Sequence, residues 1–121
     1  MKSHAAVAAV LLGRERGPSF GEEFVGSVLH DLETSALPEN EKALLRFVDK
    51  VNSDSQHIGP ADIEQLHVAG WNDEALYYTV TVCALFNFYN RWIDATGVHA
   101  LSDEAHRQGG VRSADSGYVR K

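Results

Sequence analysis

The sequence predicts an all-α fold, a helical domain of about five helices. Three observations support this prediction. Apolar residues recur at the three- to four-residue spacing of a helix face, and glycine or proline stands where most of these runs begin or end. The run of residues 73–96 contains neither glycine nor proline, and a strand of that length would be abnormal. We therefore expect helices and no sheet.

Composition places the chain among single-domain globular proteins. Its 121 residues are 44% hydrophobic and 23% charged, which is unlike a disordered chain. Its net charge of -6 would repel a nucleic-acid backbone or an anionic membrane surface. The apolar stretch 75–86 is shorter than the roughly 20 residues that cross a bilayer. We expect neither nucleic acid nor a membrane among its partners.

Two features of the sequence bear on the cellular compartment of the protein, its single cysteine and its N-terminal residues. Cys83 alone excludes an intrachain disulfide and a cysteine-built metal site. Lys2 and the apolar run 5–12 imitate a secretory signal, but the run is short and leads into Gly13 and Arg14 rather than a small-residue cleavage site. The sequence therefore favours a cytoplasmic location.

The first two helices are expected on either side of a turn-rich connector. The first covers about residues 3–12 and ends at Gly13, a residue that suits the left-handed end of a helix. The connector, residues 13–21, holds three glycines and a proline. The second helix covers about residues 20–33, and three of its apolar residues share one face: Phe24, Val28 and Leu32.

The clearest amphipathic helix opens at Pro38, with Glu39 and Glu41 in the first turn, where negative charge suits the helix dipole. Its apolar stripe contains Leu44, Leu45, Val48 and Val51. Its polar side is expected to face water and contains Lys42, Arg46, Asp49 and Lys50. After a polar loop over residues 52–59, Pro60 starts a short helix that closes at Gly70.

The last predicted helix is the longest and the most apolar. Asn72 can cap it, Asp73 and Glu74 suit its first turn, and Gly97 ends it. The alternating residues 79–82 would fit a strand locally, but the length of the run decides for a helix. Its predicted apolar face contains Ala75, Tyr78, Val82, Leu85, Tyr89 and Ile93.

This last helix also predicts association. It is too hydrophobic around its circumference to be covered by four short neighbours, so we expect a homo-oligomer. We assign the helical domain to residues 1–100. Residues 101–121 hold three glycines and few apolar side chains, which predicts a tail that is mobile or ordered by a partner subunit.

A polar stripe crosses the last helix. Its members stand at i, i+3, i+4 and i+7 and share one face with Cys83: Asn87, Asn90, Arg91 and Asp94. The stripe is either the polar wall of a binding pocket or a buried hydrogen-bond network in which Arg91 pairs with an acid. We favour the network, because such networks commonly fix helix register and association. Cys83, among apolar neighbours, is expected to be a buried structural residue.

Several kinds of site are excluded or disfavoured. The six histidines form no i, i+4 pair, and the glycines match no phosphate-binding loop, so we expect no metal and no cofactor. Residues 60–82 imitate a helix-turn-helix, but the second helix begins with Asp73 and Glu74. A DNA reader needs cations at that end, so DNA binding is not expected.

Three segments carry a family resemblance. They are residues 37–48, 69–74 and 84–91, and the most specific element is the block Phe86-Asn87-Phe88-Tyr89-Asn90-Arg91. Over about residues 3–98 the chain resembles the peroxidase-related branch of the AhpD-like/carboxymuconolactone decarboxylase superfamily. The resemblance implies an all-α protomer that assembles into oligomers.

In the redox-active branch, the motif Cys-x-x-Cys-x-x-x-His opens a helix. One thiolate attacks the peroxide, the second cysteine resolves the sulfenic acid, and the histidine and an upstream glutamate move protons. The resemblance carries over only His4, as the catalytic histidine, and the nearer cysteine would fall immediately before Met1. A start codon assigned too late, a truncated chain or a true cysteine-free relative would each explain this.

The resemblance implies an alkylhydroperoxidase-related antioxidant domain acting on organic hydroperoxides, which the chain as given cannot reduce through a dithiol. One alternative is a non-enzymatic oligomeric or small-ligand-binding helical module. Another is a carboxymuconolactone decarboxylase-like activity on a lactone, which requires a group that moves a proton. The candidate site residues for such chemistry are His4 as catalyst and Asn87, Asn90 and Arg91 as the binding stripe.

Overall fold

The computed structural model describes residues 2–117, and these form two compact units. All regular structure in this range is helical, which confirms the predicted all-α class, with six α-helices rather than five. The first unit contains α1 (Lys2–Arg16), α2 (Pro18–His30) and α6 (Asp103–Ser116). The second unit contains α3 (Glu39–Asp54), the short 3₁₀ helix η1 (Ser55–His57), α4 (Pro60–Val68) and α5 (Asp73–Ala95).

The first helix continues past the residue at which it was expected to end. Gly13 lies inside α1, its carbonyl accepts the Gly17 N–H at 2.9 Å, and the helix ends at Arg16. The turn comes at Gly17 instead, where φ is 108°, a value that L side chains rarely adopt. Pro18 then starts α2, at a position where its missing N–H costs nothing.

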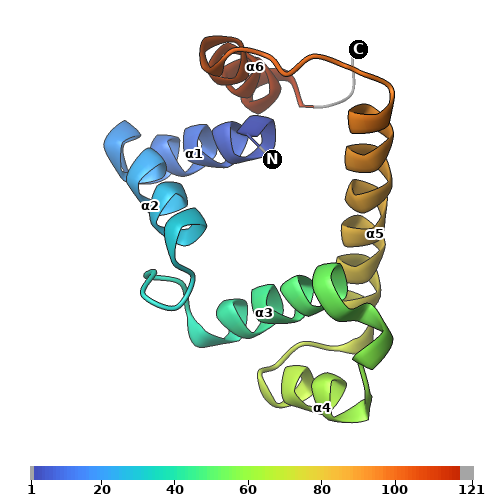
Figure 1. Cartoon of the computed structure of the whole chain (residues 1–121). Helices are drawn as coiled ribbons and strands as arrows, with labels where there is room; N and C mark the ends of the chain where they lie inside the picture. Colours follow the sequence, from blue (N-terminus) through green and yellow to red (C-terminus); the bar gives the residue numbers. More distant parts are fainter. Residues whose placement is uncertain (1, 118–121) are drawn as a thin grey trace. The chain divides into compact units, whose positions relative to one another are not determined.

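Small residues bring the helices of the first unit close together, with α1 between α2 and α6 (Figure 1). Gly21 of α2 lies so near α1 that a Cβ atom there would stand 2.0 Å from the Ala9 carbonyl oxygen. Gly110 of α6 makes a similar approach, because its Cβ would stand 2.8 Å from that of Ala6. Backbone packing of this kind needs glycine at both positions.

The C-terminal segment differs from the expected tail. Residues 103–116 form α6, which packs on α1 of its own chain. Ser102 caps the helix by accepting the Ala105 N–H at 3.2 Å, and Asp103 and Glu104 occupy its first turn. The glycines of this segment predicted a lack of order, whereas Gly110 is the point at which the two helices meet.

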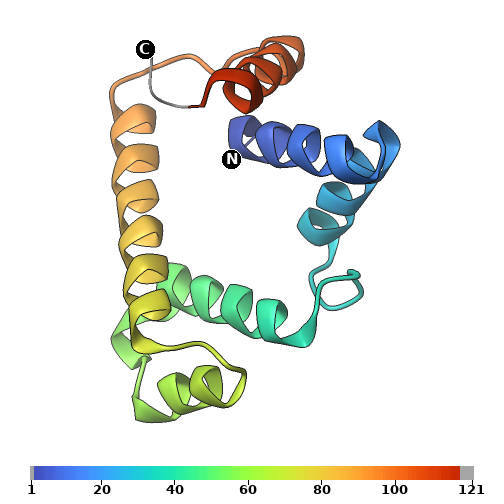
Figure 2. The ribbon, with the colours of Figure 1, turned by 180° about the vertical axis from the view of Figure 1, so that it is seen from behind.

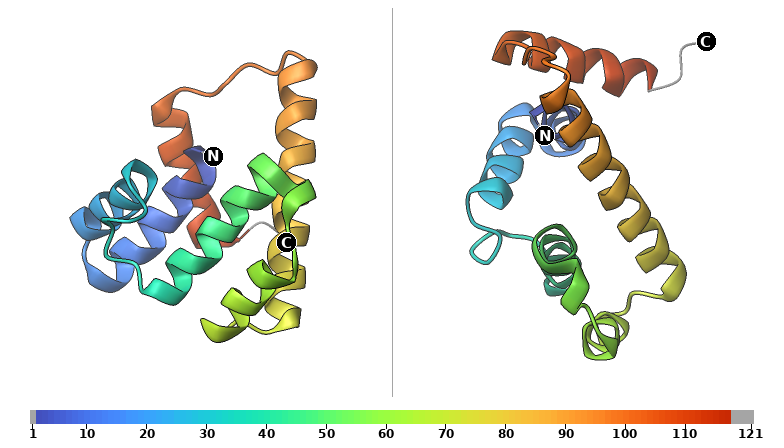
Figure 3. Two further views of the ribbon diagram at one scale, coloured as in Figure 1. Left: turned by 60° about the horizontal axis from the view of Figure 1, so that its bottom comes forward. Right: turned by 45° about the vertical axis from the view of Figure 1, so that its right-hand side comes forward.

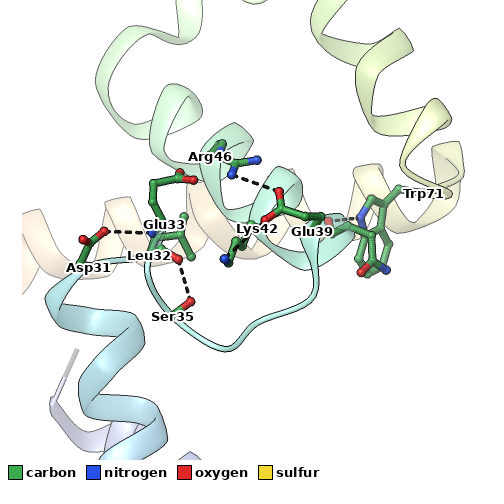
Figure 4. Close-up of polar contacts among 9 residues, drawn as sticks. Asp31, Leu32, Glu33, Ser35, Glu39, Lys42, Arg46 and Trp71 are labelled. Carbon is green, nitrogen blue, oxygen red and sulfur yellow. Dashed lines mark hydrogen bonds and ion pairs between the residues drawn. The ribbon is translucent and has the colours of Figure 1, made fainter.

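The core of the second unit forms where α3, α4 and the first half of α5 meet (Figure 2). Its buried residues are Phe47, Leu66 and Leu76, one from each helix. Half-buried residues around them include Ile63 and Trp71. The Trp71 indole N–H donates to the Asn40 carbonyl at 2.7 Å, which ties the loop before α5 to the start of α3 (Figure 4).

Lys42 was expected to face water, but it is 7% exposed. A lysine can bury its aliphatic stem while its ammonium reaches a charged partner. Lys42 Nζ stands 3.4 Å from a carboxylate oxygen of Glu39, one turn earlier. Arg46 contacts the same carboxylate at 3.3 Å (Figure 4).

The predicted cap of α5 is confirmed, and most of the predicted apolar face is exposed rather than packed against the other helices of the unit. Asn72 Oδ1 accepts the Ala75 N–H at 2.9 Å. The buried residues of α5 are Leu76 and Cys83, on the side that meets α3, whereas Tyr78 and most of the predicted face are exposed. The second half of α5 extends past α3 and α4 (Figure 3).

Candidate functional site

The first unit contains a cavity of about 840 Å3, lined by residues of α1, α2 and α6. Its apolar wall consists mainly of small and aliphatic side chains from two helices: Ala5, Ala6, Ala9 and Val10 from α1, and Val25 and Leu29 from α2. Polar and charged side chains that also line it come from all three helices: Arg14, Glu22, Asp103, His106 and Arg107. Its volume lies within the roughly 300–1,000 Å3 typical of small-molecule sites.

Small residues explain why this space is open. Ala5, Ala9 and Gly13 recur at four-residue intervals, so they lie along one face of α1 and project little into the cavity. Gly26 lines the opposite wall, on α2, and a Cβ atom there would meet no atom within 4 Å. A larger side chain at Gly26 would extend into open space, whereas a Cβ atom at Gly13 would stand 3.1 Å from the Pro18 Cα atom.

The two arginines that line the cavity are paired with acids. Arg14 forms an ion pair with Asp115 and donates to the Ala114 carbonyl at 3.1 Å, and both partners belong to α6. Arg107 forms an ion pair with Glu104. Because these charges are matched within the protein, the lining does not concentrate positive charge.

Glu104 stays ionised beside the cavity. Gln108 donates to its carboxylate at 2.8 Å, and this hydrogen bond and the charge of Arg107 hold the pKa of Glu104 below its ordinary value. Glu22 adds a negative charge to the lining itself. A negatively charged ligand would therefore meet about as much repulsion as attraction, which favours an uncharged one.

The stripe of α5 forms a hydrogen-bonded row that reaches α3. The Cys83 thiol donates to Asn52 Oδ1 at 3.1 Å, and Asn87 Nδ2 donates to the same oxygen at 2.5 Å. Arg91 in turn donates to Asn87 Oδ1 at 3.0 Å, so its partner is an amide oxygen rather than the acid that was expected. Asn90, the third binding residue expected there, is exposed.

The surroundings of Cys83 are those of a buried residue with a structural role. It is 8% exposed, and its sulfur contacts Asn52 and Asn87. A reactive thiol usually needs a cation, a helix N-terminus or a second cysteine beside it. Cys83 is the only cysteine of the chain and lies in the middle of α5.

His4, the expected catalytic histidine, lies in α1 with an exposed side chain. It belongs to the first unit but is not among the residues that line the cavity, whereas His106 is. Asn87, Asn90 and Arg91 belong to the second unit. The expected site residues are therefore divided between the two units.

A smaller hollow of about 190 Å3 lies between α3 and α4 in the second unit. The Lys50 ammonium and the Asp62 carboxylate line it and form an ion pair at 2.7 Å. The hydrogen bond from Lys50, together with the one that the Gly59 N–H donates at 2.8 Å, holds the pKa of Asp62 below its ordinary value. Through these contacts, Lys50 and Asp62 hold the start of α4 in place.

Neither the cavity nor the role of Asn52 was predicted from the sequence. Ala5, Ala9 and Gly13 give a signal for close helix approach, and Ser102 followed by Asp103 and Glu104 is a helix-start signal. Neither signal reveals that the space between the helices stays open. Asn52 carries no local signal, because its partners lie more than thirty residues later.

In the part of the chain that the structure describes, no helix has both the length and the apolarity needed to cross a membrane. Over the same residues, no three His, Cys, Asp or Glu side chains gather in a way that could hold a metal ion. Comparisons with family models, with curated proteins and with solved structures gave no match.

Proposed function

We propose that this chain is a small-ligand-binding helical module whose site is the cavity among α1, α2 and α6. The observation that carries this proposal is the cavity itself, about 840 Å3 in volume and walled mainly by alanine, glycine, valine and leucine. Burial of apolar ligand surface in such a site is worth about 25 cal/mol per Å2 removed from water. The cavity can therefore bind a ligand of drug-like size.

The charges beside the cavity define the class of ligand. Arg14 and Arg107 are paired with acids, and Glu22 adds a negative charge to the lining. The ligand is therefore uncharged and largely apolar. Organic hydroperoxides and lactones, the two substrate classes that the family resemblance implies, fit this description.

The family resemblance itself remains part of the proposal. An AhpD-like antioxidant domain would reduce hydroperoxides through two cysteines, and this chain has only Cys83, whose thiol donates to Asn52. We therefore expect this polypeptide to bind a hydroperoxide without reducing it through a dithiol. Peroxide turnover that disappears in Cys83→Ser would contradict this expectation.

Thermal stabilisation provides the first test. The protein is heated with cumene hydroperoxide, with an alkyl-substituted γ-lactone or with naphthalene, and its unfolding is followed by circular dichroism. A ligand present at about 100 times its Kd stabilises the native state by about 2.7 kcal/mol, so the melting temperature should rise by several degrees. The absence of any shift with all three compounds would contradict the proposal.

A matched pair of variants tests the location of the site. Gly26→Leu places a side chain in the open space, and because leucine forms helices better than glycine, folding should survive. We expect this variant to weaken ligand binding at least about tenfold, since the cavity is partly filled. Ser27→Leu is the control, because Ser27 is exposed and does not line the cavity. Unchanged affinity in Gly26→Leu would contradict the location.

A further inference from the structure

A row of large apolar side chains lies exposed along α5. We call it the α5 seam, and it consists of Tyr78, Val82, Leu85, Tyr89 and Trp92. Each of these side chains is between 49% and 60% exposed. Contiguous exposed apolar surface of this kind commonly marks an interaction site. We propose that the α5 seam is the surface through which two copies of this chain associate, helix against helix.

The spacing of the seam residues is that of a helix pair. Successive members are separated by four, three, four and three residues, which is the repeat of 3.5 that two supercoiled helices share. One further step of the same repeat in each direction reaches Ala75 before the seam and Thr96 after it. Residues at this spacing act as knobs that fit into holes of an identical helix.

The charge distribution on α5 fits a second copy. The positions beside the seam carry Phe86, Phe88 and Ile93, which are exposed and apolar. The charged residues Arg91 and Asp94 lie on the other side of the helix, with Asn87. Two chains of net charge -6 repel one another on average, so they can meet along the stretch of the seam from Tyr78 to Trp92, which lies beyond Glu74 and carries no charge.

The exposed apolar area of α5 is also large enough for a dimer interface. A fully buried large aromatic side chain contributes about 150–250 Å2, so the half-exposed seam with its three apolar neighbours offers roughly 700 Å2. A standard interface takes about 800 Å2 from each partner. A self-complementary patch of this size suits a two-fold dimer, the commonest form of soluble oligomer.

Sedimentation equilibrium of the full chain tests the association. We expect a species of twice the 13.3 kDa chain mass. Tyr78→Glu and Leu85→Glu each place two like charges in the interface and should raise the dissociation constant at least about tenfold. Tyr77→Glu is the matched control, because Tyr77 is 70% exposed but lies off the seam. A monomeric wild-type chain, or a dimer that the seam variants leave intact, would overturn the proposal.

A cross-linking experiment is independent of the charged variants. Leu85 is the central seam residue, so in a symmetric parallel or antiparallel pair it lies opposite its counterpart. Leu85→Cys in a Cys83→Ala background should therefore form an intermolecular disulfide under mild oxidation. Asn90→Cys in the same background is on the other side of the helix and should not. Equal cross-linking of both variants, or of neither, would overturn the proposal, whether or not a ligand binds in the cavity.

Discussion

At the scale of single residues, Gly21 and Gly26 stand five positions apart in α2 and have opposite surroundings. A Cβ atom on Gly21 would stand 2.0 Å from the Ala9 carbonyl oxygen and 2.8 Å from the Gly13 nitrogen. A Cβ atom on Gly26 would meet nothing within 4 Å. The first glycine is required for packing against α1, and the second leaves the cavity open.

The two glycines therefore predict opposite effects of the same substitution. Gly21→Ala forces the backbones of α1 and α2 apart and should destabilise the protein by at least about 2 kcal/mol. Gly26→Ala should stabilise it by about 0.5–1 kcal/mol, because alanine favours the helix and meets no neighbour. Urea denaturation of both variants provides the measurement. Equal effects of the two substitutions would contradict the close approach of α2 to α1.

At this scale, a feature could be predicted from the sequence where its cause is local. The Asn72 cap depends on a neighbour three residues away and was predicted. The burial of Lys42 was not predicted, because charge alone suggests exposure while the long aliphatic stem permits burial. The hydrogen bonds of Cys83 and Asn87 depend on Asn52, which only the packing of α5 on α3 brings near.

At the scale of elements, the cap of α5 fixes where the longest helix begins. Asn72→Ala removes the acceptor for the Ala75 N–H, so we expect a loss of about 1 kcal/mol in the free energy of unfolding. Asn72→Asp keeps an acceptor oxygen at that position and should cost little. Thermal unfolding of both variants would test the cap, and an equal loss in each would count against it.

The helix type of α5 could be predicted from the sequence, but its buried side could not. Apolar residues cover most of its circumference, so hydrophobicity does not select one face. Contact with α3 selects the side that bears Leu76 and Cys83. The predicted apolar face supplies most of the α5 seam.

The order of α6 was missed for a different reason. Because glycine has a low helix propensity, a segment with Gly109 and Gly110 is not expected to form a helix. Packing outweighs propensity here, since the lack of a side chain at Gly110 lets α6 meet α1 at Ala6. Tertiary contacts of this kind are invisible to a local interpretation of the sequence.

At the scale of the whole molecule, α6 links packing to the proposed function. Gly110→Leu would place a side chain where a Cβ already stands 2.8 Å from that of Ala6, so α6 should detach from α1. We expect faster proteolysis of α6 and at least about tenfold weaker ligand binding, because α6 supplies part of the cavity lining. Association through the α5 seam should persist.

Gly109→Leu is the matched control for this substitution. The nearest atom to a Cβ at Gly109 is an Arg112 nitrogen at 3.9 Å, at the end of a flexible side chain. The control should therefore keep α6 in place and bind ligand with unchanged affinity. If both variants retained a protected α6, the close contact at Gly110 would not be what holds the helix.

The central claim is that a ligand binds between α1, α2 and α6. The most direct test is a titration of isotope-labelled protein with whichever of the three compounds stabilises it most, followed by amide nuclear magnetic resonance. We predict that the shifted amides will be those of the cavity walls, including Ala9, Val25, Gly26 and His106. Shifts confined to α3, α4 and α5 would contradict the account.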